Sequence, residues 1–326
     1  MRKTSQVKLE HYVPKLYLRN FAITDKKDHI YCFDKYTGKS FVTNIKNIAS
    51  EVYFYETDKV DNKIEYIFGR FESHLKPIYD KLIFEQDINC LTFDEKKWIA
   101  TFVALQALRT KQYQEMVRKW YEKIAGYAKG VRVSYDLEQY LQSELLKSKT
   151  EEDLKALHVG HFDMIENTAI SLIRMIWTLV INDTDMSYWT SDHPVYPPVL
   201  QAWNAMQIQI PLSSKVSLFF SDLSIYGASH SSYIVPNVDK IIEQNSWQVM
   251  AARQYIFSDN ANYSHAKNMI QKFPELRDIT REQQYTFDVD LKNILSRRIF
   301  QSDMSYSHDI VRIIDLFRRH QHDKDS

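Results

Sequence analysis

The stretch IEYIFGRFESHLKPIYDKL, residues 64–82, carries the clearest structural pattern of the chain. Apolar residues recur in it at spacings of three and four, which is the pattern of a helix that buries one face. We therefore expect an amphipathic helix from about Asp61, with a kink or a break at Pro77, because proline lacks the N–H that an interior turn uses. The buried face comprises Ile64, Ile67, Phe68, Phe71, Leu75, Ile78 and Leu82.

The segments that follow continue this helical pattern. A second helix is expected to begin near Asp94, with Thr92 or Asp94 as its cap, and to extend to about Ala125. Similar periodicity predicts a shorter helix over 133–146 and one or two long helices over 151–181. The tail over 280–326 mixes arginines with apolar residues and is predicted to form a C-terminal amphipathic helix. The middle of the chain is therefore predicted to be helical.

Strand patterns lie on both sides of this helical region. Residues 30–33 and 40–43 are rich in β-prone side chains and flank a turn with Gly38, which predicts a hairpin. In the C-terminal half, strand patterns occur around Trp189 and over 207–210, 216–220 and 254–257, with a helix capped by Asn237 before the last one. We expect one small antiparallel sheet that joins the hairpin to these later strands.

The predicted fold class is α+β, as a predominantly helical single domain over 1–326. Within it we distinguish an N-terminal segment and hairpin (1–60), a helical region (61–181), a strand-rich region (186–260) and a helical tail (280–326). With 44% hydrophobic and 26% charged residues, the composition is typical of a soluble globular protein that can bury a sizeable core.

Charge and cysteine content exclude several classes of protein. The 42 basic residues balance 42 acidic ones, so binding to nucleic acid would need a local patch. Two cysteines without a CxxC partner exclude a disulfide framework and a thiolate zinc site. Because the chain shows neither a signal peptide nor an apolar stretch long enough to span a bilayer, we expect a cytoplasmic protein that does not bind membranes.

The first candidate for a functional site is HYVPKLYLRNF, residues 11–21. Pro14 fixes its own φ and favours an extended Val13, so His11 would precede a short helical run. Lys15 and Arg19 place two cations on that run. The alternative is an N-terminal segment that packs its aromatic side chains onto the body of the protein.

The second candidate is WTSDHPV, residues 189–195. Asp192 and His193 would lie at the end of a strand and be stiffened by Pro194. There Asp192 can orient His11, bind a metal ion or accept a substrate proton. The alternative is a turn in which Ser191 and Asp192 accept main-chain N–H groups.

Two expected helices add charged and polar candidates. Gln106 and Arg109 are three residues apart and can point the same way, and a guanidinium aimed into a cleft would bind phosphate or carboxylate in a forked geometry. Glu65 and Glu72 lie two turns apart on one face, about 10 Å along the axis. The alternative for Glu72 is an ordinary exposed ion pair with Lys76.

A basic stretch interleaved with aromatic residues follows Gln106. Such a pattern can track a phosphate backbone and stack bases, although a solvated basic face with its aromatic residues in the core has the same pattern. The basic residues are Arg109, Lys111, Arg118, Lys119, Lys123, Lys129 and Arg132, and the aromatic ones are Tyr113, Trp120, Tyr121 and Tyr127.

A metal site is suggested only weakly by the sequence. His158 and His161 are three residues apart, a spacing that can bind a divalent metal, but HVGHFD lacks the glutamate of a zinc protease helix. Phosphate-binding loops and serine elbows are absent from the sequence.

Four segments together resemble one known family. HYVPKLYLRNF at 11–21, QALRT at 106–110, WTSDHPV at 189–195 and PLS at 211–213 are similar to the landmarks of the bacterial family catalogued as domain of unknown function 4238. The resemblance extends from about His11 to about Phe257 and implies a shared fold and a shared site, without supplying a reaction. It also implies a link of some members to defence against phage, which favours nucleases and toxins.

From these observations we expect an intracellular nuclease or RNase-like effector, in line with a role in anti-phage defence. His11 would act as general acid or base, Asp192 as its orienting group or a metal ligand, and Arg109 with Arg19 as a phosphate clamp. A divalent metal is the cofactor considered, and nucleic acid is the expected partner. The remaining substrate contacts would come from Lys15, Gln106 and Asn245.

Two other classes of protein fit the same residues. One is a non-catalytic module that binds a small ligand or a partner protein, or assembles with further copies of itself. The other is a toxin-like effector that a partner protein holds silent.

Overall fold

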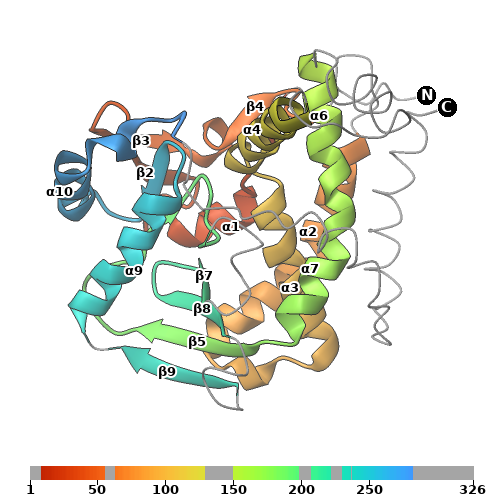
Figure 1. Ribbon diagram of the computed structural model, residues 1–326. Helices are drawn as coiled ribbons and strands as arrows, with labels where there is room; N and C mark the ends of the chain where they lie inside the picture. The colour runs from red at the N-terminus through yellow and green to blue at the C-terminus, as the bar shows by residue number, and fades with distance from the viewer. Residues whose placement is uncertain are drawn as a thin grey trace, which may run out of the picture.

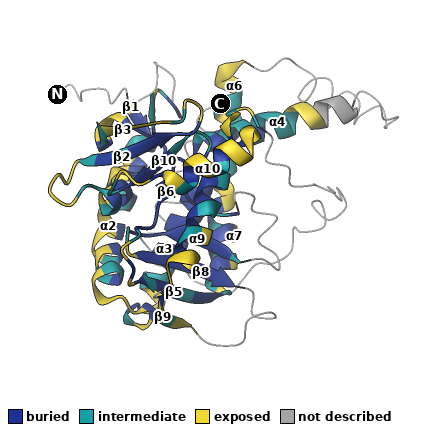
Figure 2. Ribbon diagram, turned by 90° about the vertical axis from the view of Figure 1, so that its left-hand side faces the viewer, coloured by how far each residue is buried: buried dark blue, intermediate teal, exposed yellow. Residues whose placement is uncertain are grey.

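The computed structural model describes residues 9–55, 63–128, 150–197, 207–221, 230–235 and 237–281. Two four-stranded sheets lie at opposite ends of this structure, and a layer of long helices runs along both of them (Figure 1). The predicted α+β class is confirmed. Buried residues line the interior between the helices and the sheets (Figure 2).

The first sheet joins the two ends of the described chain, as predicted. Its strands are ordered β3-β2-β10-β6 and all of its pairs are antiparallel; they are β2 (His29–Asp34), β3 (Lys39–Asn44), β6 (Thr190–Ser191) and β10 (Tyr255–Ser258). The predicted hairpin of β2 and β3 is confirmed. Gly38 in its turn has a φ of 73°, a left-handed conformation that glycine adopts without strain.

The prediction of a single antiparallel sheet is wrong, because a second sheet is present and it is mixed. Its order is β7-β8-β5-β9, and β5 pairs with β9 in parallel; the strands are β5 (Ile176–Asn182), β7 (Ile208–Pro211), β8 (Val216–Ser221) and β9 (Ser231–Val235). A separate short pair is formed by β1 (Leu9–His11) and β4 (Ser50–Val52).

The prediction of a helix up to 181 is also wrong, since helix α7 ends at Ile173 and β5 begins at Ile176. Apolar residues alone do not separate a buried helix from a buried strand. The segment IWTLVIN is rich in β-branched and aromatic side chains, which pack well on a pleated surface, and β8 and β9 flank it on both sides. Pairing with β8 and β9 therefore makes this segment a strand and not a continuation of helix α7.

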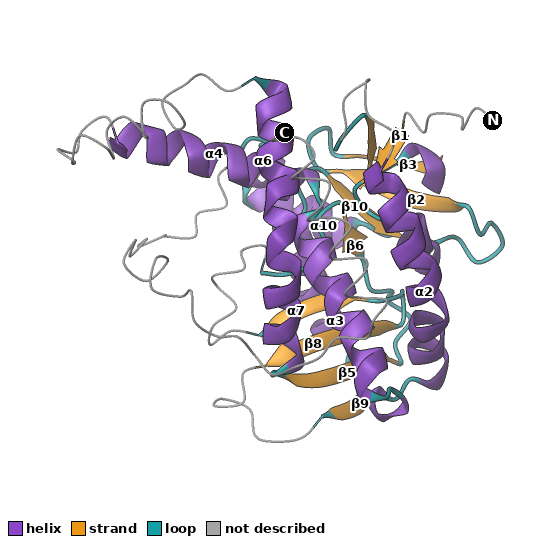
Figure 3. Cartoon of the chain, turned by 90° about the vertical axis from the view of Figure 1, so that its right-hand side faces the viewer, coloured by secondary structure: helices purple, strands orange, loops and turns teal. Residues whose placement is uncertain are grey.

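The helices otherwise follow the predicted order. Those that carry the core run side by side in Figure 3, where α2, α3 and α7 form the long layer and α4 projects from its end. The α-helices are α1 (Lys15–Leu18), α2 (Lys63–Glu85), α3 (Phe93–Leu108), α4 (Lys111–Ala128), α6 (Glu151–Gly160), α7 (Ile165–Ile173), α9 (Val238–Ala251) and α10 (Ser264–Lys272). The 3₁₀ turns are η1 (Arg19–Phe21), η2 (Ile45–Asn47), η3 (Ile88–Cys90), η5 (His161–Met164) and η7 (Pro274–Arg277).

Three predictions about the helices, on Pro77, on the helix from Asp94 to Ala125 and on the caps, can be compared with the structure. Helix α2 includes Pro77 and continues to Glu85, so no break occurs there; Pro77 is exposed, and water can reach the carbonyl that the proline leaves unpaired. The expected helix from Asp94 to Ala125 is two helices, because the Thr110 hydroxyl accepts the N–H of Tyr113 and starts α4. Caps at Thr92 and Asn237 are confirmed.

Two predicted elements cannot be compared with the structure. The helix expected over 133–146 and the tail from 282 to 326 lie outside the described residues, and so do Lys129 and Arg132 of the basic stretch.

Candidate functional site

The four sequence segments that resemble one family meet in the folded chain. Tyr17 of the first segment is fully buried, and its hydroxyl donates to the main-chain oxygen of Pro211 at 2.6 Å. The same hydroxyl lies 2.7 Å from Oγ1 of Thr190. One side chain of the N-terminal segment thus binds two segments that follow about 170 and 190 residues later in the sequence.

The QALRT segment at the end of α3 holds the N-terminal segment through its polar side chains. Arg109 is 1% exposed and donates to the main-chain oxygen of His11 at 2.6 Å and to Oε1 of Glu72 at 3.3 Å. Its guanidinium lies over the ring of Phe68, 4.0 Å from the centroid. Gln106 donates to the oxygen of Tyr12 at 3.2 Å. The positions of His11 and Tyr12 are therefore set by α3.

The next residue of QALRT contacts the third segment. Oγ1 of Thr110 lies 2.5 Å from Nδ1 of His193, and both residues are fully buried. The hydroxyl of Tyr55 donates to the main-chain oxygen of Arg109 at 2.8 Å. A continuous set of hydrogen bonds therefore joins 11–21, 106–110 and 189–195.

His11 is the chemically distinctive member of this centre. Burial, with the nearby charges of Lys15 and Arg109, lowers the pKa of His11 from 6.5 to about 4, so the imidazole is neutral at pH 7. Among the described residues its Nε2 is buried without a hydrogen-bond partner. A neutral imidazole with one nitrogen uncommitted can accept or deliver a proton.

Glu65 lies beside His11 at the N-terminal end of α2. Its Oε1 accepts the main-chain N–H of His11 at 3.0 Å. Burial raises the pKa of Glu65, although the charges of Arg109 and Lys15 oppose the rise. The two neighbouring groups are thus shifted in opposite directions, His11 toward its neutral base form and Glu65 toward its protonated acid form.

Asp192 is buried and directs both carboxylate oxygens to main-chain donors. Oδ1 accepts the N–H of Arg253 at 2.8 Å, and Oδ2 accepts those of Gln254 at 2.8 Å and Tyr255 at 3.0 Å. This is a variant of the turn alternative, in which residues 253–255 supply the N–H groups. Asp192 approaches the N-terminal segment through Tyr12, whose pKa is raised chiefly by burial and further by the charge of Asp192.

Two other predicted site residues lie away from His11. Arg19 is exposed and pairs with Asp28 at 3.1 Å. Asn245 of α9 is fully buried and accepts the N–H of Trp189 at 2.8 Å while donating to the oxygen of Ser187 at 3.0 Å. Asn245 therefore fixes the segment that leads into β6. Lys15, by contrast, is exposed and near enough to affect the pKa of His11.

Sequence reasoning missed two residues of this centre. Glu10 precedes His11 in β1, is fully buried, and accepts the N–H of Tyr55 at 2.7 Å through Oε2. Tyr55 binds the oxygen of Arg109. A glutamate in a three-residue strand and a tyrosine after β4 have no local pattern that marks them. Only the pairing of β1 with β4 brings these segments together.

The remaining candidates have mainly protein partners. Nε2 of His158 lies 2.7 Å from the oxygen of Leu108, and Nδ1 of His161 lies 2.9 Å from the hydroxyl of Tyr113. In the parts of the chain that the structure describes, no three His, Cys, Asp or Glu side chains are grouped as metal ligands. On α4, Arg118 pairs with Glu115 at 3.3 Å.

The fold and this centre define an α+β protein in which a buried arginine binds the N-terminal segment, next to a histidine whose Nε2 has no hydrogen-bond partner among the described residues. The chain belongs to the family whose model is described as protein of unknown function (DUF4238), which matches residues 10–262. Comparison with curated proteins and with solved structures gives no match. None of the described helices is long and apolar enough to cross a membrane.

Proposed function

We propose that this protein is a nuclease that cleaves RNA, with His11 and Glu65 as its acid–base pair and Lys15 as a phosphate contact. The observation that carries the proposal is the uncommitted Nε2 of a neutral His11 beside a carboxyl group whose pKa is raised. Neighbouring groups with pKa values shifted apart are the usual signature of acid–base catalysis.

The proposed reaction uses the 2′-hydroxyl of RNA as nucleophile. His11 accepts the proton of this hydroxyl while the O2′–P bond forms, and Glu65 donates a proton to the 5′-oxygen while the P–O5′ bond breaks. The products are a 2′,3′-cyclic phosphate and a free 5′-hydroxyl. A phosphate bound by Lys15 brings a negative charge near His11, which raises the pKa of this imidazole and strengthens it as a base.

In this proposal, Arg109 and Asp192 act as positioning residues. Arg109 donates to His11 and Glu72, and Asp192 accepts three main-chain N–H groups, so both hold the site in shape. The same observation favours the second candidate, a module that binds a ligand or a partner without turnover, because such side chains build a rigid scaffold equally well.

The proposal is tested by incubating labelled single-stranded RNA, and DNA of the same sequence, with the protein in the presence of a chelator. We expect cleavage of RNA alone. Substituting His11→Gln or Glu65→Gln should each lower the rate by about 100-fold or more. Arg19→Ala is the matched control, since Arg19 belongs to the same segment but pairs with Asp28 at the surface.

The pH dependence separates catalysis from a loss of folding. Because His11 acts as a base, the rate should rise as pH increases through the pKa of His11, which is about 4 in the free protein. The Glu65→Gln variant should lose the decline on the alkaline side. Intact RNA in every lane with wild-type protein, or unchanged cleavage by His11→Gln, would refute the nuclease proposal.

A further inference from the structure

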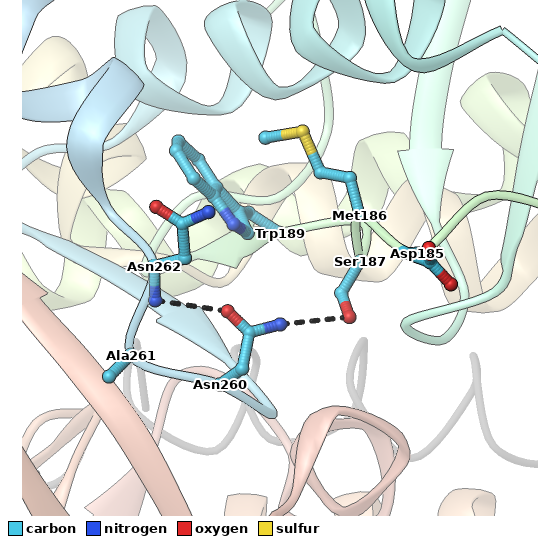
Figure 4. A pocket seen from close by; sticks show the side chains of 7 residues that line it. All are labelled: Asp185, Met186, Ser187, Trp189, Asn260, Ala261 and Asn262. Atoms are coloured by element: carbon cyan, nitrogen blue, oxygen red, sulfur yellow. Dashed lines mark hydrogen bonds between the residues drawn. The ribbon is translucent and has the colours of Figure 1, made fainter.

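Buried polar atoms without a hydrogen-bond partner mark places that a ligand or a water molecule can complete. In the cavity shown in Figure 4, Asn260 donates to Oγ of Ser187 at 3.0 Å, so these two side chains satisfy each other. Beside His11, in contrast, a second polar atom is buried without a partner among the described residues. It is the hydroxyl oxygen of Ser50, the first residue of β4.

The pairing of β1 with β4 places Ser50 directly opposite His11. The N–H of Tyr12 donates to the oxygen of Ala49 at 3.0 Å, so these two residues form a hydrogen-bonded pair and His11 and Ser50 form the adjacent non-hydrogen-bonded pair. The main-chain N–H and oxygen of His11 accordingly bind side chains from α2 and from the end of α3. In a non-hydrogen-bonded pair the two Cα atoms are about 4.5 Å apart and the two side chains share one face. The imidazole and the hydroxyl are therefore neighbours.

The two neighbouring groups offer one acceptor and one donor. The main chain of Lys46 and Ile45 interacts with the imidazole and opposes the lowering of the pKa of His11, the effect that carbonyl oxygens have on a ring N–H. Because Nε2 lacks a partner in the described chain, this interaction involves Nδ1, which therefore carries the proton and leaves a lone pair on Nε2. The hydroxyl of Ser50 is free to donate. A single ligand can thus use both groups.

The surroundings of this pair are near the surface and include positive charge. Ser50 is itself partly exposed, and the side chain of Lys15 is exposed and close enough for its charge to lower the pKa of His11. Lys46, whose main chain interacts with the imidazole, is exposed as well. Two exposed cations next to a buried donor and acceptor favour an anionic ligand.

The backbone that carries Ser50 is strained. Ala49 has a φ of 52°, in the left-handed region that residues with a Cβ seldom adopt. Its oxygen accepts the N–H groups of Tyr12 at 3.0 Å and Val13 at 3.4 Å, which hold it there. Such strain is typical of functional sites, where it fixes the position of the adjacent side chain.

We propose that Ser50 is a further catalytic residue, whose hydroxyl donates a hydrogen bond to a non-bridging oxygen of the scissile phosphate. This rests on the proposed function, in which His11 takes the proton of the 2′-hydroxyl. The 2′-oxygen and the non-bridging oxygens surround one phosphorus atom in the transition state, so their partners must be neighbours in the protein, as His11 and Ser50 are. Negative charge on the non-bridging oxygens is stabilised by a donor already fixed in place, and Ser50 keeps its proton throughout. The other occupant of this position is a water molecule that bridges Nε2 and Oγ.

The first test compares the rates of RNA cleavage by Ser50→Ala and by the wild type. We expect kcat to fall by about 100-fold, as for the loss of one donor to a developing negative charge, and KM to change by less than about threefold. Ser50→Thr keeps the hydroxyl and should retain most of the activity. Ser40→Ala, at an exposed serine of β3, is the matched control and should leave kcat unchanged.

RNA with sulfur in place of one non-bridging oxygen at the scissile phosphate separates a direct contact from a structural role. Sulfur accepts hydrogen bonds weakly, so the wild type should cleave one of the two diastereomers more slowly than the other. Ser50→Ala should lose this preference. A variant that is slower but keeps the preference would show that Ser50 acts only on the shape of the site.

Binding of uridine 3′-monophosphate, measured by isothermal titration calorimetry, gives a readout that needs no turnover. We expect Ser50→Ala to bind it about tenfold more weakly than the wild type does, as for a lost hydrogen bond to a charged group. Thermal unfolding checks the fold, and Ser50→Ala should be at least as stable as the wild type because it removes a hydroxyl without a partner in the described chain.

The two measurements distinguish the failure of this proposal from that of the nuclease proposal. Unchanged kcat and unchanged affinity in Ser50→Ala would overturn the role of Ser50 and leave the nuclease proposal intact, with water as the partner of the hydroxyl. If the wild type leaves RNA intact but binds the nucleotide about tenfold more tightly than Ser50→Ala does, the nuclease proposal fails and Ser50 remains a phosphate-binding residue. Neither cleavage nor binding by the wild type would overturn both.

Discussion

Replacing Asp192 by asparagine is the sharpest test of how this centre is built. The carboxylate accepts three main-chain N–H groups, from Arg253 through Oδ1 and from Gln254 and Tyr255 through Oδ2. An asparagine is almost the same size, yet only one of its two terminal atoms accepts hydrogen bonds. If its oxygen replaces Oδ2, the amide nitrogen faces the N–H of Arg253, and two donors then oppose each other.

The magnitude follows from these contacts. A hydrogen bond to a charged group contributes about 1.5 to 3 kcal/mol, and a buried donor left without a partner costs about 1 to 3 kcal/mol. Asp192→Asn loses one such bond and the charge on the other two, so we expect a loss of about 2 to 3 kcal/mol in the free energy of unfolding. Asp192→Ala loses all three bonds and should lose about 4 kcal/mol or more.

Urea unfolding followed by tryptophan fluorescence measures both variants. Asp185→Asn is the matched control, because Asp185 is exposed and its loss should change stability by less than about 0.5 kcal/mol. If Asp192→Asn unfolds at the same urea concentration as the wild type, the carboxylate does not hold residues 253–255 as described. A stable but inactive variant would then support a catalytic role for Asp192 itself.

Three further predictions concern the same polar centre and are measured by the same method. Arg109→Met leaves the carboxylate of Glu72 and the oxygen of His11 without their donor, so stability should fall by about 3 to 5 kcal/mol, against about 1 kcal/mol or less for the exposed Arg19→Met. Tyr17→Phe removes the bond to Pro211 and should cost about 1 to 3 kcal/mol, whereas Tyr36→Phe, at an exposed ring, should have almost no effect. The pKa of the buried His158 is lowered from 6.5 to about 4, so the stability it contributes is complete above pH 6.5 and is lost as the pH falls to 4. This lowering of the pKa corresponds to about 3 kcal/mol in the free energy of unfolding. The His158→Gln variant should therefore lose less stability than the wild type between pH 6.5 and pH 4. An equal loss in both proteins would contradict the burial of a neutral imidazole.

The sequence predicted those parts of the fold that local patterns determine. The hairpin around Gly38 and the caps at Thr92 and Asn237 follow from residues close together in the chain, and each is confirmed. Strand β5 was missed because its apolar residues fit a helix equally well, and only pairing with β8 and β9 makes it a strand. Register and sheet order depend on contacts between distant segments, which composition does not encode.

The candidate site was likewise predicted only in part from the sequence. The segments that meet were identified from the sequence, but the partner of each side chain was not. Arg109 was expected to bind a phosphate, and its bonds instead go to Glu72 and to the oxygen of His11. Glu72 was weighed as a surface partner of Lys76, which pairs with Asp80 instead. A charged residue on a helix can reach partners of opposite charge both four residues before it and four residues after it, so the spacing alone does not identify the pair. Here the buried Arg109 binds Glu72 from another helix.

The Nε2 of His11, which has no hydrogen-bond partner among the described residues, is informative because it lowers the stability of the native state. A buried polar atom without a hydrogen bond destabilises the native state by about 1 to 3 kcal/mol, and the chain surrounds this one with side chains that bind the adjacent main chain. Arg109 and Glu65 contact only the main-chain atoms of residue 11, and although the imidazole interacts with the main chain of Lys46 and Ile45, its Nε2 has no hydrogen-bond partner among the described residues. We therefore infer that the imidazole is retained for a proton or a ligand that approaches Nε2, and His11→Leu tests this directly. If the variant is at least as stable as the wild type but inactive on RNA, the histidine serves function at the expense of stability. If it is less stable by about 2 kcal/mol or more, the imidazole is a structural element and the His11 centre loses its chemical rationale.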